Sequence, residues 1–397
     1  MLENEMLSHS ISTLKQLKSH LKLSSTEEKC LARVIRTHPM RISPHYTSLI
    51  DWNDPDDPIK KMAVPSINEL NLEGYYDTSG ECENTKMPGI QHKYSETALI
   101  LATNQCATYC RHCFRKRLVG LPTEETLKRF EDAAGYITKH PEINNVLISG
   151  GDPLTLPNTI IERFLKLLTR IPHINFIRFG SRVPVTLPSR LEDRKLLNIF
   201  KKHSRSDKRL YVVTQFNHPK EINPSSIKAV NNLINAGVIL NNQTVLLKQV
   251  NDTPDTLAKL MNRLASIGVI PYYVFQCRPL ERVKHHFQVP LCEGVRIVEE
   301  AKARCNGLSK RFKYIMSHKT GKIEILGILD DDIFFKYHEA KNRKTLGTIF
   351  KRQVDEKAGW LDDFKPYTDL DRIERKLKAK LSIRERPRTE ITILEQT

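Results

Sequence analysis

The stretch TALILATNQCATYCRHCFRKR, residues 97–117, places a short apolar run directly before a dense group of cysteines and basic residues. The run TALILA, residues 97–102, has the length and apolar content of a buried β-strand. Three cysteines, Cys106, Cys110 and Cys113, follow within eight residues. In a barrel of parallel strands the carboxyl ends of the strands gather at one face, so side chains directly after this strand are candidates for a functional site.

Outward from this strand, short apolar or β-branched runs alternate with amphipathic helical stretches over residues 91–330. The predicted strands are residues 97–102, 144–150, 174–180, 209–216, 238–247, 271–277 and 322–328. The predicted helices are residues 123–140, 159–171, 225–237, 256–268 and 294–305. This alternation predicts an α/β fold with a parallel sheet, and the number of units favours a partial (β/α) barrel over a doubly wound sheet.

The regions on either side of the predicted barrel have a different character. Residues 1–90 are expected to form a helical N-terminal region, because residues 13–23 have helical apolar spacing and a loop-like segment follows. Residues 331–397 are expected to form a charged C-terminal extension, with helical spacing in LDRIERKLKAKL at residues 370–381.

The composition narrows the class of protein. The net charge is +17 over 397 residues, but no nucleic-acid-binding motif accompanies it, so we expect a solvated basic surface. No run approaches the roughly 20 apolar residues that a membrane span requires. The N-terminus lacks the apolar core of a signal peptide, which predicts a cytoplasmic protein. In that reducing compartment the eight cysteines favour metal or redox chemistry over disulfides.

The spacing C-x3-C-x2-C limits what the three clustered cysteines can bind. Three thiolates are one too few for a closed structural zinc site or for a fully ligated iron–sulfur cube. A [4Fe–4S] cluster held by three cysteines keeps one iron open for a second molecule. Three buried cysteines, or cysteines that share a zinc ion, are the alternative interpretation.

A second motif, ISGGDPL at residues 148–154, follows the second predicted strand. Gly150 and Gly151 allow the backbone to approach a ligand closely, and Asp152 adds a hydrogen-bond acceptor. A tight turn between strand and helix would explain the two glycines equally well.

Together the two motifs resemble those of the radical S-adenosylmethionine (SAM) enzymes. Further segments are similar to the lysine 2,3-aminomutase family, in order from about residue 50 to residue 328. These segments are DPDDPIKKMAVP, CRHCFRKR, ISGGDPL, RFGSRVPVTLP, TQFNHPKEI, NAGVILNNQTVLLKQVND and PYYVFQC. The resemblance implies a partial barrel of the radical SAM type that uses a [4Fe–4S] cluster and SAM to produce a 5′-deoxyadenosyl radical.

The resemblance also implies roles for individual residues. Cys106, Cys110 and Cys113 would ligate the cluster. Residues that would bind SAM are Gly150, Gly151, Asp152 and Gln243. Arg115 matches the arginine that binds the substrate carboxylate. The implied partners are an amino acid or related carboxylate and a reductant of the flavodoxin or ferredoxin type, and a homo-oligomer is compatible with this reading. No catalytic residue is assigned.

Two departures concern pyridoxal phosphate (PLP), which the aminomutases also use. The family's Gly-rich lysine segment before the strand matched by YIMS, residues 314–317, is missing, and Lys310, Lys313, Lys319 and Lys322 do not align with its lysine. Lys93, Tyr94 and Thr97 stand where the family's Arg-Tyr-x-x-Arg binds the phosphate. A phosphate site without its bidentate arginines is weakened, so we expect no PLP bound in the family's way.

A third departure concerns the substrate. Arg278 stands where the lysine enzymes have an aspartate for the substrate ε-amino group. This exchange predicts that free lysine is disfavoured and that a carboxylate-bearing group is favoured. The alternative for Arg278 is an ion pair with Glu281 at the surface.

Two other functions stay open at this point. One is a PLP-dependent 2,3-aminomutase with a relocated lysine, acting on an acidic or other non-lysine amino acid. The other is a non-catalytic cluster protein that binds nucleic acid through its basic tail, although the complete cluster and SAM motifs argue against it.

Overall fold

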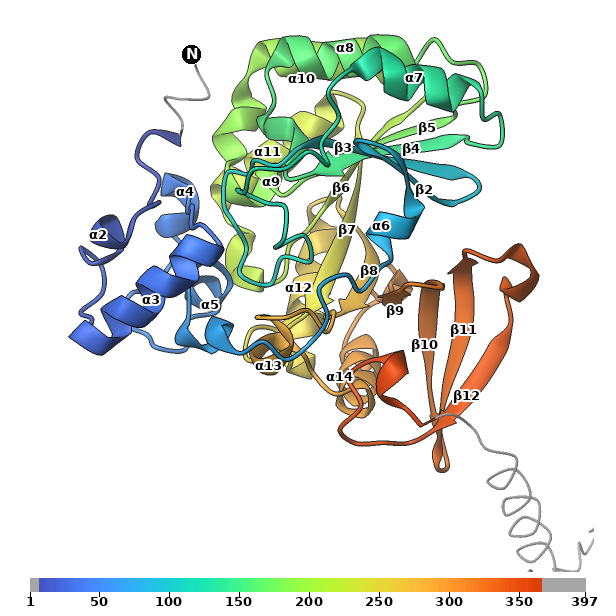
Figure 1. Cartoon of the computed structure of the whole chain (residues 1–397). Coiled ribbons are helices and arrows are strands. Elements are labelled where there is room, and N and C mark those ends of the chain that lie inside the picture. The colour runs from blue at the N-terminus through green and yellow to red at the C-terminus, as the bar shows by residue number, and fades with distance from the viewer. Residues whose placement is uncertain (1–6, 366–397) are drawn as a thin grey trace, which may run out of the picture.

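The computed structural model describes residues 7–365, and a single twelve-stranded sheet in the order β1 to β12 runs through it. Seven neighbouring strands, β3 to β9, are parallel and curve into an unclosed barrel (Figure 1). They are β3 Thr97–Thr103, β4 Asn145–Gly150, β5 Phe176–Gly180, β6 Leu210–Thr214, β7 Ile239–Leu246, β8 Ile270–Gln276 and β9 Lys313–His318. The predicted partial barrel is confirmed. Of its seven parallel strands only β9 was missing from the predicted set. The strand predicted over residues 322–328 is β10, Gly321–Leu329, which pairs antiparallel with β9 and so is not one of the parallel strands.

Helices cover the outer face of the parallel strands because each has one apolar stripe. In α8, Asn158–Leu168, the buried residues Ile161, Phe164, Leu165 and Leu168 follow helical spacing. Burying one such side chain stabilises the fold by roughly 1.5–3 kcal/mol. The other covering helices are α7 Phe130–Thr138, α10 Arg194–His203, α11 Pro224–Asn235, α12 Pro254–Ser266 and α14 Leu291–Ala303.

The helix predicted over residues 123–140 begins only at Phe130. The residues before it are held by the sheet, because the Leu127 amide donates to the Leu101 carbonyl at 2.8 Å. Gly89 packs so closely that a Cβ atom there would lie 2.4 Å from the Leu127 backbone. This tertiary contact overrides the helical pattern of the segment.

The N-terminal region contains several short helices. They are α2 Leu14–Leu17, α3 Ser25–Thr37, α4 Pro44–Thr47, α5 Pro58–Ala63, η1 Ile67–Leu70 and α6 Glu81–Asn84. The helix expected over residues 13–23 is only one turn, α2, and Ser24 then caps the start of α3 through a capping box. Strands β1 Thr85–Met87 and β2 Ile90–Tyr94 follow and pair antiparallel, with β2 continuing antiparallel onto β3.

The sheet continues beyond residue 330, where a charged extension was predicted. Strands β10 Gly321–Leu329, β11 Asp332–Ala340 and β12 Ile349–Gln353 form an antiparallel end to the sheet (Figure 1). Ile333 and Phe335 on β11 are fully buried, while the charged residues Asp332, Lys336 and Glu339 lie before and after them on the same strand. The helix predicted over residues 370–381 lies outside the described residues.

No helix in residues 7–365 has both the length and the apolar character that crossing a membrane requires.

Candidate active site

All nine residues predicted for the site line one cavity of about 350 Å³ within the barrel. They are Cys106, Cys110, Cys113, Arg115, Gly150, Gly151, Asp152, Gln243 and Arg278. They come from the loops after β3, β4 and β8, except that Gly150 is the last residue of β4 and Gln243 lies within β7. Parallel strands bring these points together because their carboxyl ends share one face of the barrel.

The three clustered cysteines lie on the irregular loop between β3 and α7, and none forms a disulfide. Burial raises the pKa of the Cys113 thiol to about 11 and also raises the pKa of the Cys106 thiol well above its ordinary value. Without a bound cation the cavity therefore favours neutral thiols. Three thiols that line one cavity, two of them with a pKa raised by burial, fit a thiophilic metal centre with an open position.

Arg182 is a site residue that sequence reasoning did not single out. It follows β5, and its Nη1 donates to the Sγ of Cys110 at 2.5 Å. Its Nη2 pairs with the fully buried Glu221 at 2.6 Å. The tyrosine hydroxyl of Tyr46 also donates to Glu221, at 2.6 Å. The sequence feature that could have identified Arg182 is its place in SRVP, residues 181–184, directly after a predicted strand.

The positive charge around the cysteines is neutralised mostly from the N-terminal region. The buried carboxylate of Glu69, on η1, pairs with Arg111 at 2.6 Å and with Lys116 at 2.7 Å. Glu81, on α6, pairs in the same way with Arg115 at 3.1 Å and Arg117 at 2.5 Å. These four ion pairs attach the cysteine loop to the N-terminal helices.

Removal of Glu69 is expected to destabilise the protein. Burial alone would raise the pKa of the Glu69 carboxyl, but Arg111 and Lys116 outweigh it and hold the pKa at about 2. Glu69→Gln leaves two cations buried without a carboxylate, and we expect a loss of about 3–5 kcal/mol of unfolding free energy by urea denaturation. The exposed Glu73, which pairs with Lys284, is the matched control, and Glu73→Gln is expected to change stability by less than about 0.5 kcal/mol.

The ion pairs of Glu69 with Arg111 and Lys116 also predict that the stability of the protein depends on pH. The folded pKa of Glu69, about 2, lies below the unfolded value of about 4.3. The contribution of the Glu69 ion pairs to the unfolding free energy is therefore complete above about pH 4.3 and is lost as the pH falls toward 2. In Glu69→Gln this part of the loss of unfolding free energy at low pH should disappear. If the difference in unfolding free energy between variant and parent stayed the same from about pH 4.3 to pH 2, the low pKa of Glu69 would be contradicted.

The glycine motif brings the loop after β4 against the cysteine loop. The amide of Gly151 donates to Thr103 O at 2.6 Å, and the amide of Asp152 donates to Gln105 O at 2.7 Å. A Cβ atom on Gly150 would lie 2.3 Å from Thr103 O, and one on Gly151 would lie 2.3 Å from Gln105 O. The close contact between the two loops is therefore sufficient to explain why both positions are glycine. Close approach of a ligand is not required to explain it.

The Asp152 carboxylate is buried and already has partners. It accepts hydrogen bonds from Ser181 Oγ and the Arg182 amide, both at 2.7 Å, and from the Leu154 amide at 3.1 Å. Burial raises the pKa of Asp152 despite these donors. Its side chain thus joins the loops after β4 and β5 at the rim of the cavity.

The two arginines predicted to bind substrate differ in their free hydrogen-bonding capacity. Besides Glu81, Arg115 donates to Ser149 Oγ at 3.1 Å and to Gly150 O at 3.4 Å. Arg278 donates from Nη2 to Ser317 Oγ at 3.0 Å, while its Nη1 is buried with no partner among the described residues. The alternative that Arg278 pairs with Glu281 at the surface is wrong, because its guanidinium lies in the cavity.

Phe114 lies between these two arginines. The guanidinium carbon of Arg115 is 4.5 Å from the centre of its ring, and that of Arg278 is 4.4 Å from it. Cation–π contacts of this kind hold a guanidinium in place without using its N–H groups. Arg278 therefore keeps a fixed orientation while Nη1 stays free to donate.

The residues that stand at the family's PLP positions line the same cavity. The Nζ of Lys93 donates to His318 O at 2.6 Å and to Ser79 O at 3.2 Å, and burial lowers the pKa of Lys93 to about 7. An amine engaged by two carbonyls is a weak phosphate ligand. Thr97 lines the cavity without supplying a positive charge.

Of the four lysines near the missing segment, Lys322 alone lines this cavity. Its Nζ pairs with Glu339 at 2.8 Å and lies over the rings of Tyr94 and Tyr273. Burial lowers the pKa of Lys322. Lys322 on β10 and Glu339 on β11 were not predicted as cavity residues. Lys322 begins the strand predicted over residues 322–328, but β11 was not predicted, and no local pattern indicates that either side chain lines the cavity.

Comparisons with known proteins show the family of this chain. The radical SAM superfamily model matches residues 100–262. A protein of Aquifex aeolicus named "Putative L-lysine 2,3-aminomutase" is 42% identical over 348 residues, which cover 87% of this chain and 91% of that protein. The L-lysine 2,3-aminomutase of Clostridium subterminale is 38% identical, covering 75% of this chain and 71% of its own. The glutamate 2,3-aminomutase of Clostridioides difficile is 37% identical, and the match covers 76% of this chain and 71% of that protein.

Proposed function

Because this chain belongs to the lysine 2,3-aminomutase family of radical SAM enzymes, we propose that it abstracts hydrogen from an amino acid that carries a second carboxylate, without holding PLP in the family's way. The family implies a [4Fe–4S] cluster and SAM, which together supply a hydrogen-abstracting radical when bound. The observation that carries the proposal is that all nine predicted residues line one cavity.

The cofactor side of the cavity supports the first part of the proposal. Cys106, Cys110 and Cys113 hold the cluster, and the cavity wall beside them receives SAM. Gln243 and the Gly150–Asp152 turn form that wall. Arg182 donates to the Sγ of Cys110 and would place its positive charge beside a cluster held by that cysteine. A hydrogen bond to a ligating sulfur raises the reduction potential of such a cluster.

The substrate side supports an acidic amino acid. The cavity wall carries Arg278 with an unused, buried Nη1 donor. A buried donor without a partner costs about 1–3 kcal/mol, and a carboxylate oxygen of the substrate would relieve this cost. Arg115, which is already paired with Glu81, positions the neighbouring Phe114 and Arg278 and adds positive charge for the α-carboxylate.

The absence of PLP chemistry is supported by two contacts. Lys93 donates to two backbone carbonyls, and Lys322 is paired with Glu339. Neither amine is free for a phosphate or an aldehyde in this arrangement. The second candidate, a PLP-dependent 2,3-aminomutase with a relocated lysine, is favoured by one observation, namely that Lys322 lies in the cavity with a lowered pKa.

The test is anaerobic reconstitution, reduction, and measurement of 5′-deoxyadenosine with a panel of free amino acids. We expect acidic amino acids to stimulate its formation more than lysine does, with or without added PLP. Arg278→Gln should raise the KM of the acidic substrate about 10- to 100-fold, as loss of a hydrogen bond to a charged group predicts. It should leave substrate-free SAM cleavage within about twofold. The exposed Arg311→Gln is the matched control.

Borohydride reduction after PLP addition separates the two candidates. The proposal expects no lysine to be labelled at stoichiometric amounts. Complete labelling of Lys322, together with activity that requires PLP, would establish the second candidate instead. A preference for lysine over acidic amino acids would contradict the role given to Arg278.

A further inference from the structure

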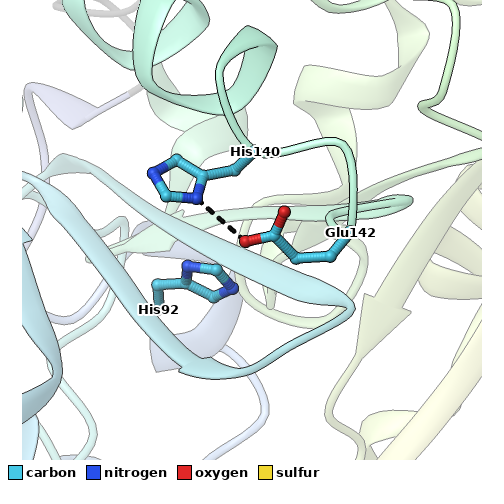
Figure 2. Close-up of side chains that lie close together, drawn as sticks. All are labelled: His92, His140 and Glu142. Carbon is cyan, nitrogen blue, oxygen red and sulfur yellow. Dashed lines mark hydrogen bonds and ion pairs between the residues drawn. The ribbon is translucent and has the colours of Figure 1, made fainter.

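His92, His140 and Glu142 form a cluster outside the cavity that the proposed chemistry does not use. His92 lies on β2, while His140 and Glu142 lie on the turn between α7 and β4. One potential ligand atom from each residue lies within 4.8 Å of the other two. Figure 2 shows the two imidazoles and the carboxylate converging from these two segments.

Second-sphere contacts orient the two imidazoles. The Nε2 of His92 lies 3.0 Å from the Ser95 carbonyl, which can only accept, so Nε2 carries the proton and Nδ1 keeps a lone pair. Tyr136 places its hydroxyl 3.0 Å from this Nδ1 and stacks its ring on His140, with centroids 4.2 Å apart. A donated N–H that fixes the tautomer is the usual support of a metal-binding histidine.

We propose that this cluster binds one divalent ion of the zinc type, with two imidazole nitrogens and one carboxylate oxygen as ligands and a fourth position open to water. Nitrogen and oxygen ligands of this kind suit Zn²⁺ and its first-row neighbours. A tetrahedral zinc ion needs its ligand atoms about 3.4 Å apart. The three ligand atoms now lie within 4.8 Å of one another, and the closest pair, His140 Nδ1 and the Glu142 carboxylate, is 2.8 Å apart. Because Glu142 is exposed, side-chain rotations at the surface bring these atoms to the spacing that zinc needs.

The ion would join two segments that border the cavity wall. His92 itself does not line the cavity, but its neighbours Gln91 and Lys93 do. The amides of Asn144 and Asn145 already donate to the carbonyl of Glu96, at 3.2 and 3.1 Å. A bound ion would therefore hold the β2–β3 hairpin more tightly to the turn before β4.

The test is anaerobic calorimetric titration of the full chain with ZnCl₂ after cluster reconstitution, so that the clustered cysteines are occupied. We expect one equivalent to bind with low-micromolar affinity. His140→Ala and Glu142→Gln should each weaken binding at least about tenfold. The exposed His285→Ala is the matched control and should bind as the parent does. Tyr136→Phe removes the hydroxyl that competes for His92 Nδ1 and should bind zinc at least as tightly as the parent.

Hydrogen exchange provides a second readout that does not depend on activity. Zinc should slow amide exchange in residues 90–96 and 140–145 of the parent, and not in Glu142→Gln, whose exposed position leaves folding intact. No binding to the parent, or stoichiometric binding that persists in both ligand variants, would overturn the site. Because cluster absorbance and SAM cleavage are measured separately, failure here leaves the proposed function untouched.

Discussion

Replacing any one of Cys106, Cys110 or Cys113 by alanine removes the iron–sulfur absorbance of the reconstituted protein and lowers SAM cleavage to the background of cluster-free protein. The three thiols are the clustered set on the loop after β3, and two remaining ligands cannot hold a cube that already has one open iron. The measurement is the absorbance spectrum after anaerobic reconstitution, followed by assay of 5′-deoxyadenosine.

A fourth cysteine in the cavity wall makes this prediction more demanding. Cys277 also lines the cavity, but it follows β8 and does not lie on the loop that carries the other three cysteines. Its side chain is directed to the Arg278 carbonyl at 3.8 Å. We therefore expect Cys277→Ser and the exposed Cys82→Ala to keep the spectrum. A cluster that survives in two of the three loop variants would show that other residues ligate it.

Gly151→Ala is expected to lower 5′-deoxyadenosine formation about 100-fold and to reduce the yield of cluster. The new Cβ would meet Gln105 O at 2.3 Å and the Gln105 backbone nitrogen at 2.8 Å. These are backbone atoms of the residue before Cys106, so the cysteine loop itself must move. A displacement of about 1 Å at a reacting centre is enough for a loss of this size. Iron content, absorbance and product formation are measured on the same preparation.

Gly135→Ala is the matched control for this substitution. Gly135 lies within α7, and no atom lies within 4 Å of the position that its Cβ would take. Alanine there should keep full activity and raise the unfolding free energy by roughly 0.5–1 kcal/mol, because glycine is the poorer helix former. Full activity of Gly151→Ala would show that the two loops can separate without harm to the site.

The sequence by itself determined the partial barrel, its first six parallel strands and nine of the residues that line the cavity. The reason is local. Buried strands and amphipathic helices have distinct periods, and in this fold the side chains just after parallel strands meet at one face. The positions of Cys106, Gly151 and Arg278 could therefore be predicted from motifs a few residues long.

The tertiary structure alone decided which partners these residues have. Glu69 pairs with Arg111 across 42 positions of chain, and Lys322 lies against Tyr94 from the far end of the sheet. No local period encodes such pairs, because they depend on which segments the fold brings side by side. Tertiary contacts also decide where α7 begins, because the hydrogen bond between Leu127 and β3 keeps the preceding residues out of the helix. They likewise explain why residue 151 is glycine, because a Cβ there would collide with the backbone of Gln105. Sequence patterns thus located residues that share one cavity. Packing between distant segments decided which of its charged groups are paired and which, like Arg278 Nη1, have no hydrogen-bond partner among the described residues.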